Sequence, residues 1–276
     1  MPALDLKLDL ETPYTLDSEK LAFFREHGYV KLKNVFSAEV LAHYGREITR
    51  KTLELNRNTL PMAERSTYNK AFIQVGNLWT KSEVVKEFVF GTRLARLAAQ
   101  LLGVSGVRMW HDQALYKEPS GGFTPWHADQ YYWPMSSEKS VTAWIPLQAV
   151  PLEMGPLAFA AKSHTFEYGR DLRIGDDSEA RISKAMQEQG FRYVEEPFDL
   201  GEVSFHYGWT FHRAGPNVTA RPREVMTVIY MDEAMRLKEP SNDNQVADWK
   251  AWCPETKIGE VMDGKLTPVI WSSRGA

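Results

Sequence analysis

A histidine and a carboxylate two residues apart stand out in the segment TPWHADQYYWPM, residues 124–135. If this segment is a strand, His127 and Asp129 project to the same side, because side chains alternate between the two faces of a strand. An imidazole and a carboxylate that share one face could bind the same metal ion. In a chain with 7 histidines and 36 acidic residues, about one such spacing arises by chance, so the pair needs a third ligand.

His212 supplies that third ligand in the segment HYGWTFHRAGPN, where a predicted strand is followed by a turn. Two histidines and one carboxylate form the facial triad of non-haem Fe(II) sites, which leaves three coordination positions open for substrate oxygens and O₂. The same three ligands with a bound water would suit a zinc hydrolase. We expect His111, His164 and His206 to be hydrogen-bonded structural residues, since buried histidines are more often of that kind.

Arg223 follows His212 by 11 residues and begins an alternating segment with Val225 and Thr227. If these three side chains face inward, the guanidinium could hold a carboxylate with two parallel hydrogen bonds. Arg221 lies two residues earlier and would face the same side of an extended chain, so the sequence leaves open which arginine forms the clamp. A carboxylate clamp argues against a zinc hydrolase, which does not require one.

The elements before residue 104 are predicted to be mainly helical. Asp17 and Gly28 are placed to begin and end one helix, and Ser37 begins another that runs to about Leu55. A third helical pattern extends from a capping box at Thr80 and Glu83 to Gly103. Residues 30–35 alternate apolar and basic side chains, which indicates an edge strand.

After Gly103 the pattern changes to short segments rich in β-forming residues and separated by Gly, Pro and Ser. These predicted strands are 107–117, 141–148, 155–161, 191–196, 202–208 and 223–231. Helices followed by a series of strands predict an α+β, mainly β fold with a barrel or sandwich core over residues 104–231. The charged segment 171–190 interrupts the strands as a partly helical insert and possible lid, and residues 232–276 are expected to wrap the barrel. We expect one domain over residues 1–276.

Composition excludes several classes of protein. The net charge is −3 and 43% of residues are hydrophobic, so neither nucleic acid nor a membrane surface is an expected partner. Cys253 is the only cysteine, which excludes an intrachain disulfide and fits a reducing compartment. With no secretory signal or long apolar run, we expect a cytoplasmic protein, as a monomer or small homo-oligomer.

These segments together resemble the phytanoyl-CoA dioxygenase family of Fe(II)/2-oxoglutarate-dependent oxygenases, which includes the ectoine hydroxylases. The resemblance rests on FREHGYVKLKNVFSAE, ALYKEPSGGFTPWHADQYYWP, VTAWIPL, GPLAFAAKSH and HRAGPN…RPR in this order. It implies a double-stranded β-helix, or jelly roll, of the cupin type, with N-terminal helices packed on one face. It also implies Fe(II), 2-oxoglutarate and O₂ as cofactor and cosubstrates, with ascorbate as reductant in assays.

The resemblance assigns a role to each matching position. His127, Asp129 and His212 correspond to the iron ligands, Arg223 to the 2-oxoglutarate clamp, Trp144, Lys117 and Gln113 to further cosubstrate contacts, and Trp133 and Tyr131 to the substrate pocket. Lys70 and Gln74 fall where the family often closes the pocket from its helical side. Ala214 replaces a small hydroxyl residue near the cosubstrate. Because Asp129 retains the carboxylate that family halogenases lack, halogenation is disfavoured.

The implied reaction is hydroxylation of an unactivated C–H bond in a small organic metabolite, with 2-oxoglutarate converted to succinate and CO₂. The sequence does not identify the substrate, and it does not separate hydroxylation from desaturation or rearrangement. Two other functions stay open at this point. One is a non-catalytic sensor that binds metal and 2-oxoglutarate, and the other is the zinc-dependent hydrolase.

Overall fold

Two antiparallel sheets face each other in the computed structural model, which describes residues 3–58 and 60–275. The larger sheet has the order β1 (Tyr29–Leu32), β8 (Val203–Tyr207), β5 (Ser140–Pro146), β10 (Val225–Asp232), β3 (Gly106–Tyr116) and β11 (Val269–Ser272), with β2 (Ile73–Gly76) also paired to β3. The smaller sheet has the order β4 (Thr124–His127), β9 (His212–Ala214), β6 (Leu157–Ala160) and β7 (Tyr193–Glu195). This is the jelly-roll, or double-stranded β-helix, architecture expected from the sequence.

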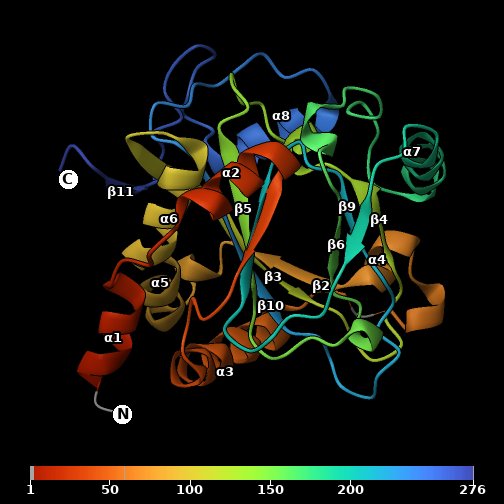
Figure 1. The fold of residues 1–276 in the computed structure, drawn as a ribbon, viewed down its shortest axis with the longest axis horizontal. Coiled ribbons are helices and arrows are strands. Elements are labelled where there is room, and N and C mark those ends of the chain that lie inside the picture. The colour runs from red at the N-terminus through yellow and green to blue at the C-terminus, as the bar shows by residue number, and fades with distance from the viewer. Residues whose placement is uncertain (1–2, 59, 276) are drawn as a thin grey trace.

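Helices from the N-terminal part cover the outer face of the larger sheet (Figure 1). Helices α6 (Thr92–Leu102) and α2 (Ser18–His27) lie against its strands, and α1 (Ala3–Glu11), α3 (Ala38–Leu55) and α5 (Glu83–Val89) complete the helical layer. Apolar side chains of α6 pack on β3, β5 and β10, so the main hydrophobic core lies between helices and sheet. The inner face of the same sheet is therefore free to face the smaller sheet and line a cavity.

Two predicted helix starts are confirmed by their capping hydrogen bonds. Asp17 Oδ1 accepts a bond of 2.6 Å from the Lys20 N–H, and Gly28 ends α2 in the left-handed conformation. Ser37 Oγ accepts from the Val40 N–H at the start of α3. Such side-chain acceptors satisfy N–H groups that have no partner within the helix.

The predicted helix from Thr80 to Gly103 is wrong in its start and in its continuity. Thr80 ends a short 3₁₀ turn, and Ser82 is the residue that caps α5. Gly91, whose backbone is not helical, then separates α5 from α6. Helix α1 passes so close to it that a Cβ at this position would lie only 3.0 Å from the Cβ of Leu10. Tertiary packing interrupts a helical pattern that looks continuous in the sequence.

The six predicted strands are present with shifts of a few residues at their ends, and residues 30–32 form the edge strand β1. The insert 171–190 contains α7 (Asp176–Glu188), which packs on β4. Residues 232–276, which were expected to wrap the barrel, contain a helix, α8 (Asp243–Trp252), and the strand β11. The elements that had no predicted counterpart also include α4 (Thr67–Ala71) and 3₁₀ turns η1 (Met62–Glu64), η2 (Leu78–Thr80), η3 (Asp129–Tyr132), η4 (Leu152–Met154) and η5 (Ser163–Thr165).

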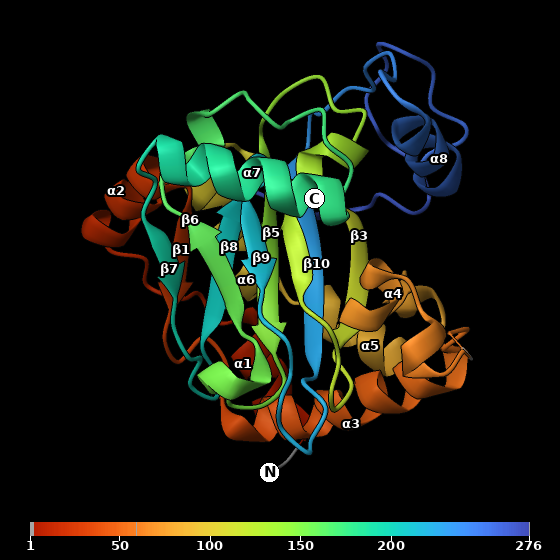
Figure 2. The same ribbon diagram turned by 90° about the vertical axis from the view of Figure 1, so that its right-hand side faces the viewer.

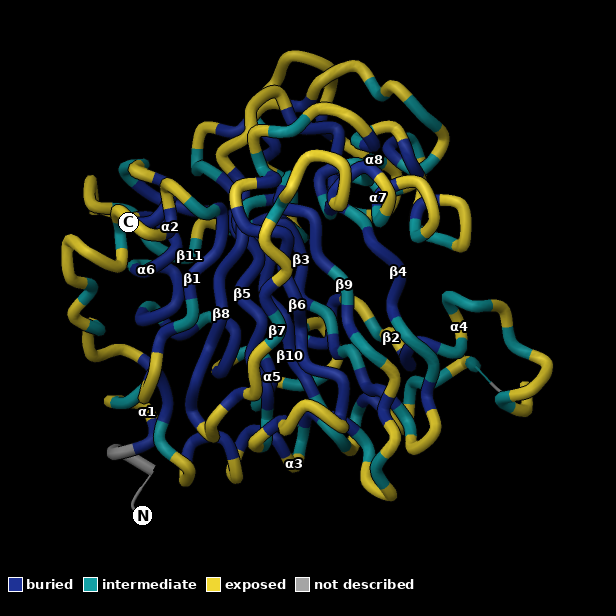
Figure 3. Tube along the Cα trace, turned by 45° about the vertical axis from the view of Figure 1, so that its right-hand side comes forward, coloured by how far each residue is buried: buried dark blue, intermediate teal, exposed yellow. Residues whose placement is uncertain are grey.

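The two ends of the strands are covered differently (Figure 2). Helices α7 and α8 lie at one end, and α3 crosses the opposite end. Figure 3 shows that the strands between them are buried, whereas the connecting loops are exposed. No helix in residues 3–58 and 60–275 is long and apolar enough to cross a membrane.

Gly155 gives a test of the fold near the cavity. Its φ is +68°, and a methyl group there would overlap the carbonyl oxygen of Gly215. Gly190 has nearly the same φ, +67°, but has open space around it. We expect Gly190→Ala to cost about 1–2 kcal/mol from left-handed strain alone, and Gly155→Ala to cost at least about 3 kcal/mol because of the added overlap. Urea unfolding of both variants measures the difference, and equal losses would contradict the assigned overlap.

Candidate metal centre

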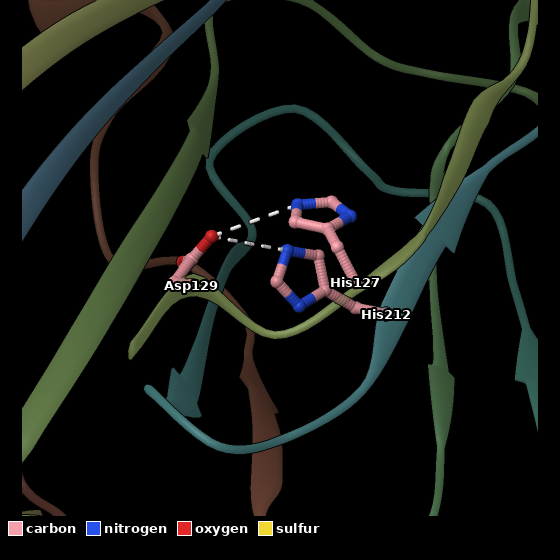
Figure 4. A group of neighbouring side chains, drawn as sticks. All are labelled: His127, Asp129 and His212. Atoms are coloured by element: carbon pink, nitrogen blue, oxygen red, sulfur yellow. Dashed lines mark ion pairs between the residues drawn. The ribbon is translucent and has the colours of Figure 1, made fainter. Parts of the chain in front are cut away.

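His127, Asp129 and His212 come together between the two sheets (Figure 4). His127 ends β4 and lies opposite His212, which begins β9 in the paired strand. The Nε2 atoms of His127 and His212 lie 3.6 Å and 3.5 Å from the same oxygen, Oδ1 of Asp129. The strand prediction is correct only to His127, since Asp129 begins the 3₁₀ turn η3. Ala128 between them is still extended, which keeps both side chains on one side.

The protonation of the two imidazoles leaves both Nε2 atoms as acceptors. His127 Nδ1 lies 2.8 Å from the Pro125 carbonyl, and His212 Nδ1 lies 2.9 Å from the Thr210 carbonyl. A carbonyl can only accept, so each Nδ1 carries the hydrogen. Burial lowers the pKa of both histidines to about 4, so the rings are neutral near pH 7.

Three acceptors therefore converge with no hydrogen between them. Two imidazole lone pairs and a carboxylate oxygen repel one another in a buried site unless a cation lies among them. Nitrogen and oxygen ligands of this kind suit Fe(II), and a carbonyl behind each imidazole is the usual support of a ligating histidine. The residues present thus fit a divalent metal ion.

The second oxygen of Asp129 is held from behind. Thr142 Oγ1 donates to Oδ2 at 2.9 Å, and His206 Nε2 lies 3.3 Å from the same atom. Burial acts to raise the pKa of Asp129, but His212, His206 and His127 in their protonated forms at low pH outweigh it and hold that pKa well below its usual range. His206 lies outside the group of three clustered ligand candidates and contacts the carboxylate of that group. With Oδ2 occupied, Oδ1 is the oxygen left for a metal.

The three residues line one cavity of about 300 Å³ together with Arg223. The Arg223 side chain is buried, donates to the Gly155 carbonyl through Nη1, and has no partner at Nε. Burial lowers its pKa to about 9, so it remains charged near neutral pH. Trp144 lies beside it, with the ring centroid 5.4 Å from the guanidinium carbon. Arg221 is exposed and does not line the cavity.

Lys117 lies next to Arg223 and is also buried. Its Nζ donates to the Gly122 carbonyl and lies 3.4 Å from Thr124 Oγ1, but it does not line the cavity. Burial and the charge of Arg223 hold the pKa of Lys117 well below its usual range. Within the described residues neither side chain forms an ion pair with Asp or Glu. Two buried basic groups without a carboxylate favour a bound anion at this end of the cavity.

The remaining predicted positions divide into two groups. Gln113, Gln74 and Trp133 line the cavity, whereas Lys70 does not. Tyr131 lies outside it and packs under α8, where its carbonyl oxygen accepts a bond of 3.0 Å from Gln245 Nε2. The expectation that Tyr131 lines the substrate pocket is therefore not met, because the η3 turn places Tyr131 under α8 and Tyr132 in the cavity lining.

Several cavity residues were not predicted at all. Tyr132 takes the place expected for Tyr131, and Tyr68 donates to Gln74, whose Nε2 donates to Gln113 Oε1 at 2.6 Å. Asp248 and Trp252 reach the cavity from α8. No sequence signal identifies these side chains, because they belong to short or polar elements whose position is set by tertiary contacts.

Comparison with known proteins agrees with this geometry. The sequence pattern of the family "Phytanoyl-CoA dioxygenase (PhyH)" matches residues 24–225. The chain belongs to the phytanoyl-CoA dioxygenase family. The matched residues include both histidines and the carboxylate of the triad as well as Arg223. As a member of this family, the protein is an Fe(II)/2-oxoglutarate-dependent dioxygenase.

Individual relatives are distant. A probable alpha-ketoglutarate-dependent hypophosphite dioxygenase of Stutzerimonas stutzeri is 23% identical over 228 residues, which are 77% of this chain and 78% of that protein. The epimerase SnoN, solved with Fe³⁺, alpha-ketoglutarate and nogalamycin RO, is 25% identical with a TM-score of 0.76, over 92% of this chain and 98% of that one. EctD from S. alaskensis, solved with 2-oxoglutarate and 5-hydroxyectoine, is 20% identical with a TM-score of 0.66, over 84% and 83%. At 20% identity the EctD structure shows a shared fold alone.

The lowered histidine pKa values predict a pH-dependent stability of the metal-free protein. The pKa of His127 falls from 6.5 to about 4 on folding, so its stabilising contribution is complete above pH 6.5 and is lost as the unfolded chain takes up a proton below it. At pH 5 this loss is about 2 kcal/mol. Asp112 and Asp248, whose pKa values burial raises to about 7, act in the opposite direction.

The test is therefore a difference between two proteins. Urea unfolding of metal-free wild type and His127→Gln at pH 7 and pH 5 should show wild type losing about 2 kcal/mol more than the variant between the two pH values. The same change in both proteins would show that His127 is not a buried neutral histidine.

Support of Asp129 gives a second prediction. Thr142→Val and His206→Leu each remove a contact to Oδ2, and we expect each to weaken Mn(II) binding about 10- to 100-fold, because outer contacts orient a ligand. Ser204→Ala is the control, since the Ser204 hydroxyl is buried on the same strand as His206 but has no hydrogen-bond partner. Isothermal titration measures the affinities, and Thr142→Val binding as tightly as wild type would count against the role of this contact.

Proposed function

We propose that this protein is a hydroxylase that uses Fe(II), 2-oxoglutarate and O₂ to oxidise an unactivated C–H bond of a small organic metabolite. The observation that carries the proposal is a single cavity that contains one group of side chains suited to a cation and one suited to an anion. At one level three acceptor atoms, from partly buried His127 and Asp129 and from buried His212, converge without a hydrogen between them. At another level the buried guanidinium of Arg223 faces the cavity and forms no ion pair with a carboxylate of the described residues.

The spacing of these two features follows from the register of the larger sheet. Thr142, which supports Asp129, lies opposite Ile229 of β10, whereas Arg223 precedes the first residue of that strand, Val225. Arg223 lies six residues from Ile229, which is roughly 20 Å along extended backbone. A short dicarboxylate that binds metal at one end and Arg223 at the other would lie along this row, past Trp144, Thr227 and Gln113, which are paired across the three strands.

Each residue has a separate role in this proposal. His127, Asp129 and His212 hold the metal on one face and leave its other positions free, and Arg223 fixes the distal carboxylate of 2-oxoglutarate. The chemistry that Fe(II) supplies when bound is the oxidation of 2-oxoglutarate to succinate and CO₂ coupled to oxidation of a substrate C–H bond. The indole and phenol rings of Trp133 and Tyr132 exclude water and orient the substrate.

The cavity lining supports an organic substrate. The relative from Stutzerimonas stutzeri is named for hypophosphite, a small inorganic anion, but here the part of the cavity beyond the triad is walled by Tyr68, Tyr132, Trp133 and Trp252. Aromatic walls of this kind bury apolar surface and suit carbon-containing molecules. A volume of about 300 Å³, shared with 2-oxoglutarate, limits the substrate to a small molecule.

The proposal is tested by adding Fe(II), ascorbate and 2-oxoglutarate without air. A weak visible charge-transfer band is expected when 2-oxoglutarate binds the metal, and succinate is expected after air is admitted with a panel of organic substrates. A band without succinate from any substrate would indicate a sensor that binds both groups without turnover. The absence of a band in wild type would overturn the proposal.

Arg223 and Arg221 form a matched pair for a second test. Arg223→Gln should weaken 2-oxoglutarate binding about 100-fold, because the buried end of the cavity loses its charged donor. Arg221→Gln should bind as wild type does, since Arg221 is exposed. Titration of the charge-transfer band gives both affinities, and a large loss in Arg221→Gln with none in Arg223→Gln would transfer the clamp to Arg221.

A further inference from the structure

Helix α8 brings an acidic side chain to the cavity from outside the residues that match the family. The family pattern ends at residue 225, and α8 spans Asp243–Trp252. Asp248 and Trp252 of this helix both line the cavity that contains the triad. Among the described residues, the acidic and basic side chains of that lining are Asp129, Arg223 and Asp248.

The position of α8 is fixed relative to the metal ligands. Gln245 Nε2 and Asn242 Nδ2 donate to the Tyr131 carbonyl at 3.0 Å and 3.3 Å, and Asn244 Nδ2 donates to the Tyr131 hydroxyl at 3.2 Å. Tyr131 belongs to η3, the turn that begins with Asp129. Three side chains of α8 thus hold one residue of this turn, so Asp248 has a defined place beside the triad.

Strand β3 shows which end of the cavity Asp248 serves. His111, Gln113 and Leu115 of β3 line the cavity in turn, and Lys117 just beyond the strand pairs with Arg223. The Trp252 ring lies 5.2 Å from the His111 ring, at the other end of this row. Six residues of strand span roughly 20 Å, so α8 covers the end away from Arg223. Figure 2 shows α8 at the end of the strands opposite α3.

Asp248 has no countercharge among the described residues. It forms no ion pair, and Arg173, which is exposed, acts on the hydroxyls of Tyr68 and Tyr132 instead. Burial raises the pKa of Asp248 to about 7, and the indole of Trp252 acts weakly in the opposite direction without reaching hydrogen-bond geometry. A partly buried carboxylate in this state gains most from a ligand that brings a positive charge.

The surrounding rings favour an organic cation over a hydrated metal ion. Trp252, Trp133 and Tyr132 line the same region, and the faces of such rings attract cations. His111 beside Trp252 is neutral near pH 7, because burial lowers its pKa to about 4, so it does not repel a positive charge.

We propose that the substrate carries a protonated amine, which Asp248 binds as an ion pair against Trp252 while the C–H bond to be oxidised lies at the triad. This inference rests on the proposed function and adds the chemical class of the substrate. The two ends of the cavity then have opposite preferences, with Arg223 selecting the anionic cosubstrate and Asp248 selecting a cationic substrate.

The test is a binding panel on the anaerobic holoenzyme loaded with Fe(II) and 2-oxoglutarate. The panel contains matched pairs of small organic amines and neutral partners of the same shape, such as benzylamine with benzyl alcohol and cyclohexylmethylamine with cyclohexylmethanol. Tryptophan fluorescence and isothermal titration report binding independently of turnover. We expect the tightest ligands to be amines, bound at least about tenfold more tightly than their partners, since a charged hydrogen bond contributes more than a neutral one.

Two variants on the same helix separate the role of Asp248 from a general effect of charge. Asp248→Asn keeps the shape and should remove the preference for amines. Asp243→Asn changes an exposed residue of α8 outside the cavity lining and should retain it. Thermal unfolding of both variants checks folding, and the wild-type panel is informative even if Asp248→Asn does not fold.

Each outcome decides the question. A panel in which no amine binds more tightly than its partner, including one in which nothing binds, overturns the proposal. So does tighter binding of the alcohols that is lost in Asp248→Asn, which would make Asp248 a neutral hydrogen-bond donor. Because the charge-transfer band is recorded first, an intact band without amine preference rejects the substrate class alone, whereas a missing band rejects the proposed function.

Discussion

The site depends on two unfavourable arrangements inside the protein, one of hydrogen-bond acceptors and one of basic side chains. At one point the Nε2 atoms of His127 and His212 face the same oxygen of Asp129, and all three are acceptors. At the other point Arg223 and Lys117 are buried side by side without an acid. Folding alone leaves both arrangements unsatisfied, so each is retained at a cost that a ligand offsets. The first arrangement favours a cation and the second an anion, which supports the proposed metal ion and 2-oxoglutarate.

Holding like groups together requires a rigid frame. The paired strands β4 and β9 of the smaller sheet hold the two histidines side by side, and the larger sheet holds Thr142 behind Asp129. Its central strands β5, β10 and β3 are paired along their length, and the helices fill the outer face with an apolar core. The side chains on the inner face cannot move apart without breaking this register. The backbone carbonyls behind the two histidines and the contacts to Asp129 Oδ2 complete the support.

The sequence predicts the candidate metal ligands and the candidate carboxylate clamp, because few other roles explain these residue types at these spacings. The spacing of His127 and Asp129, a later His212 after a turn, and Arg223 at the start of a strand each have a local reason, and the structure brings these side chains to one cavity. The expectation for Tyr131 is wrong, because in the η3 turn its neighbour Tyr132 lines the cavity instead. Prediction also fails for α8, whose side chains are largely polar and whose place is set by hydrogen bonds to a distant turn.

The residues that the sequence predicts and those that it misses lie in different parts of the fold. The side chains that we propose to bind metal and 2-oxoglutarate lie on strands or directly beside them, within residues 24–225, which the family pattern matches. Asp248 and Trp252 lie on a helix beyond that range, which side-chain hydrogen bonds from Asn242 and Gln245 attach to the η3 turn. A helix held in this way can change its inward residues without disturbing the strand register, since no ladder hydrogen bond passes through it. The C-terminal segment is therefore the part of the chain in which substrate preference can diverge while the oxidative core stays the same.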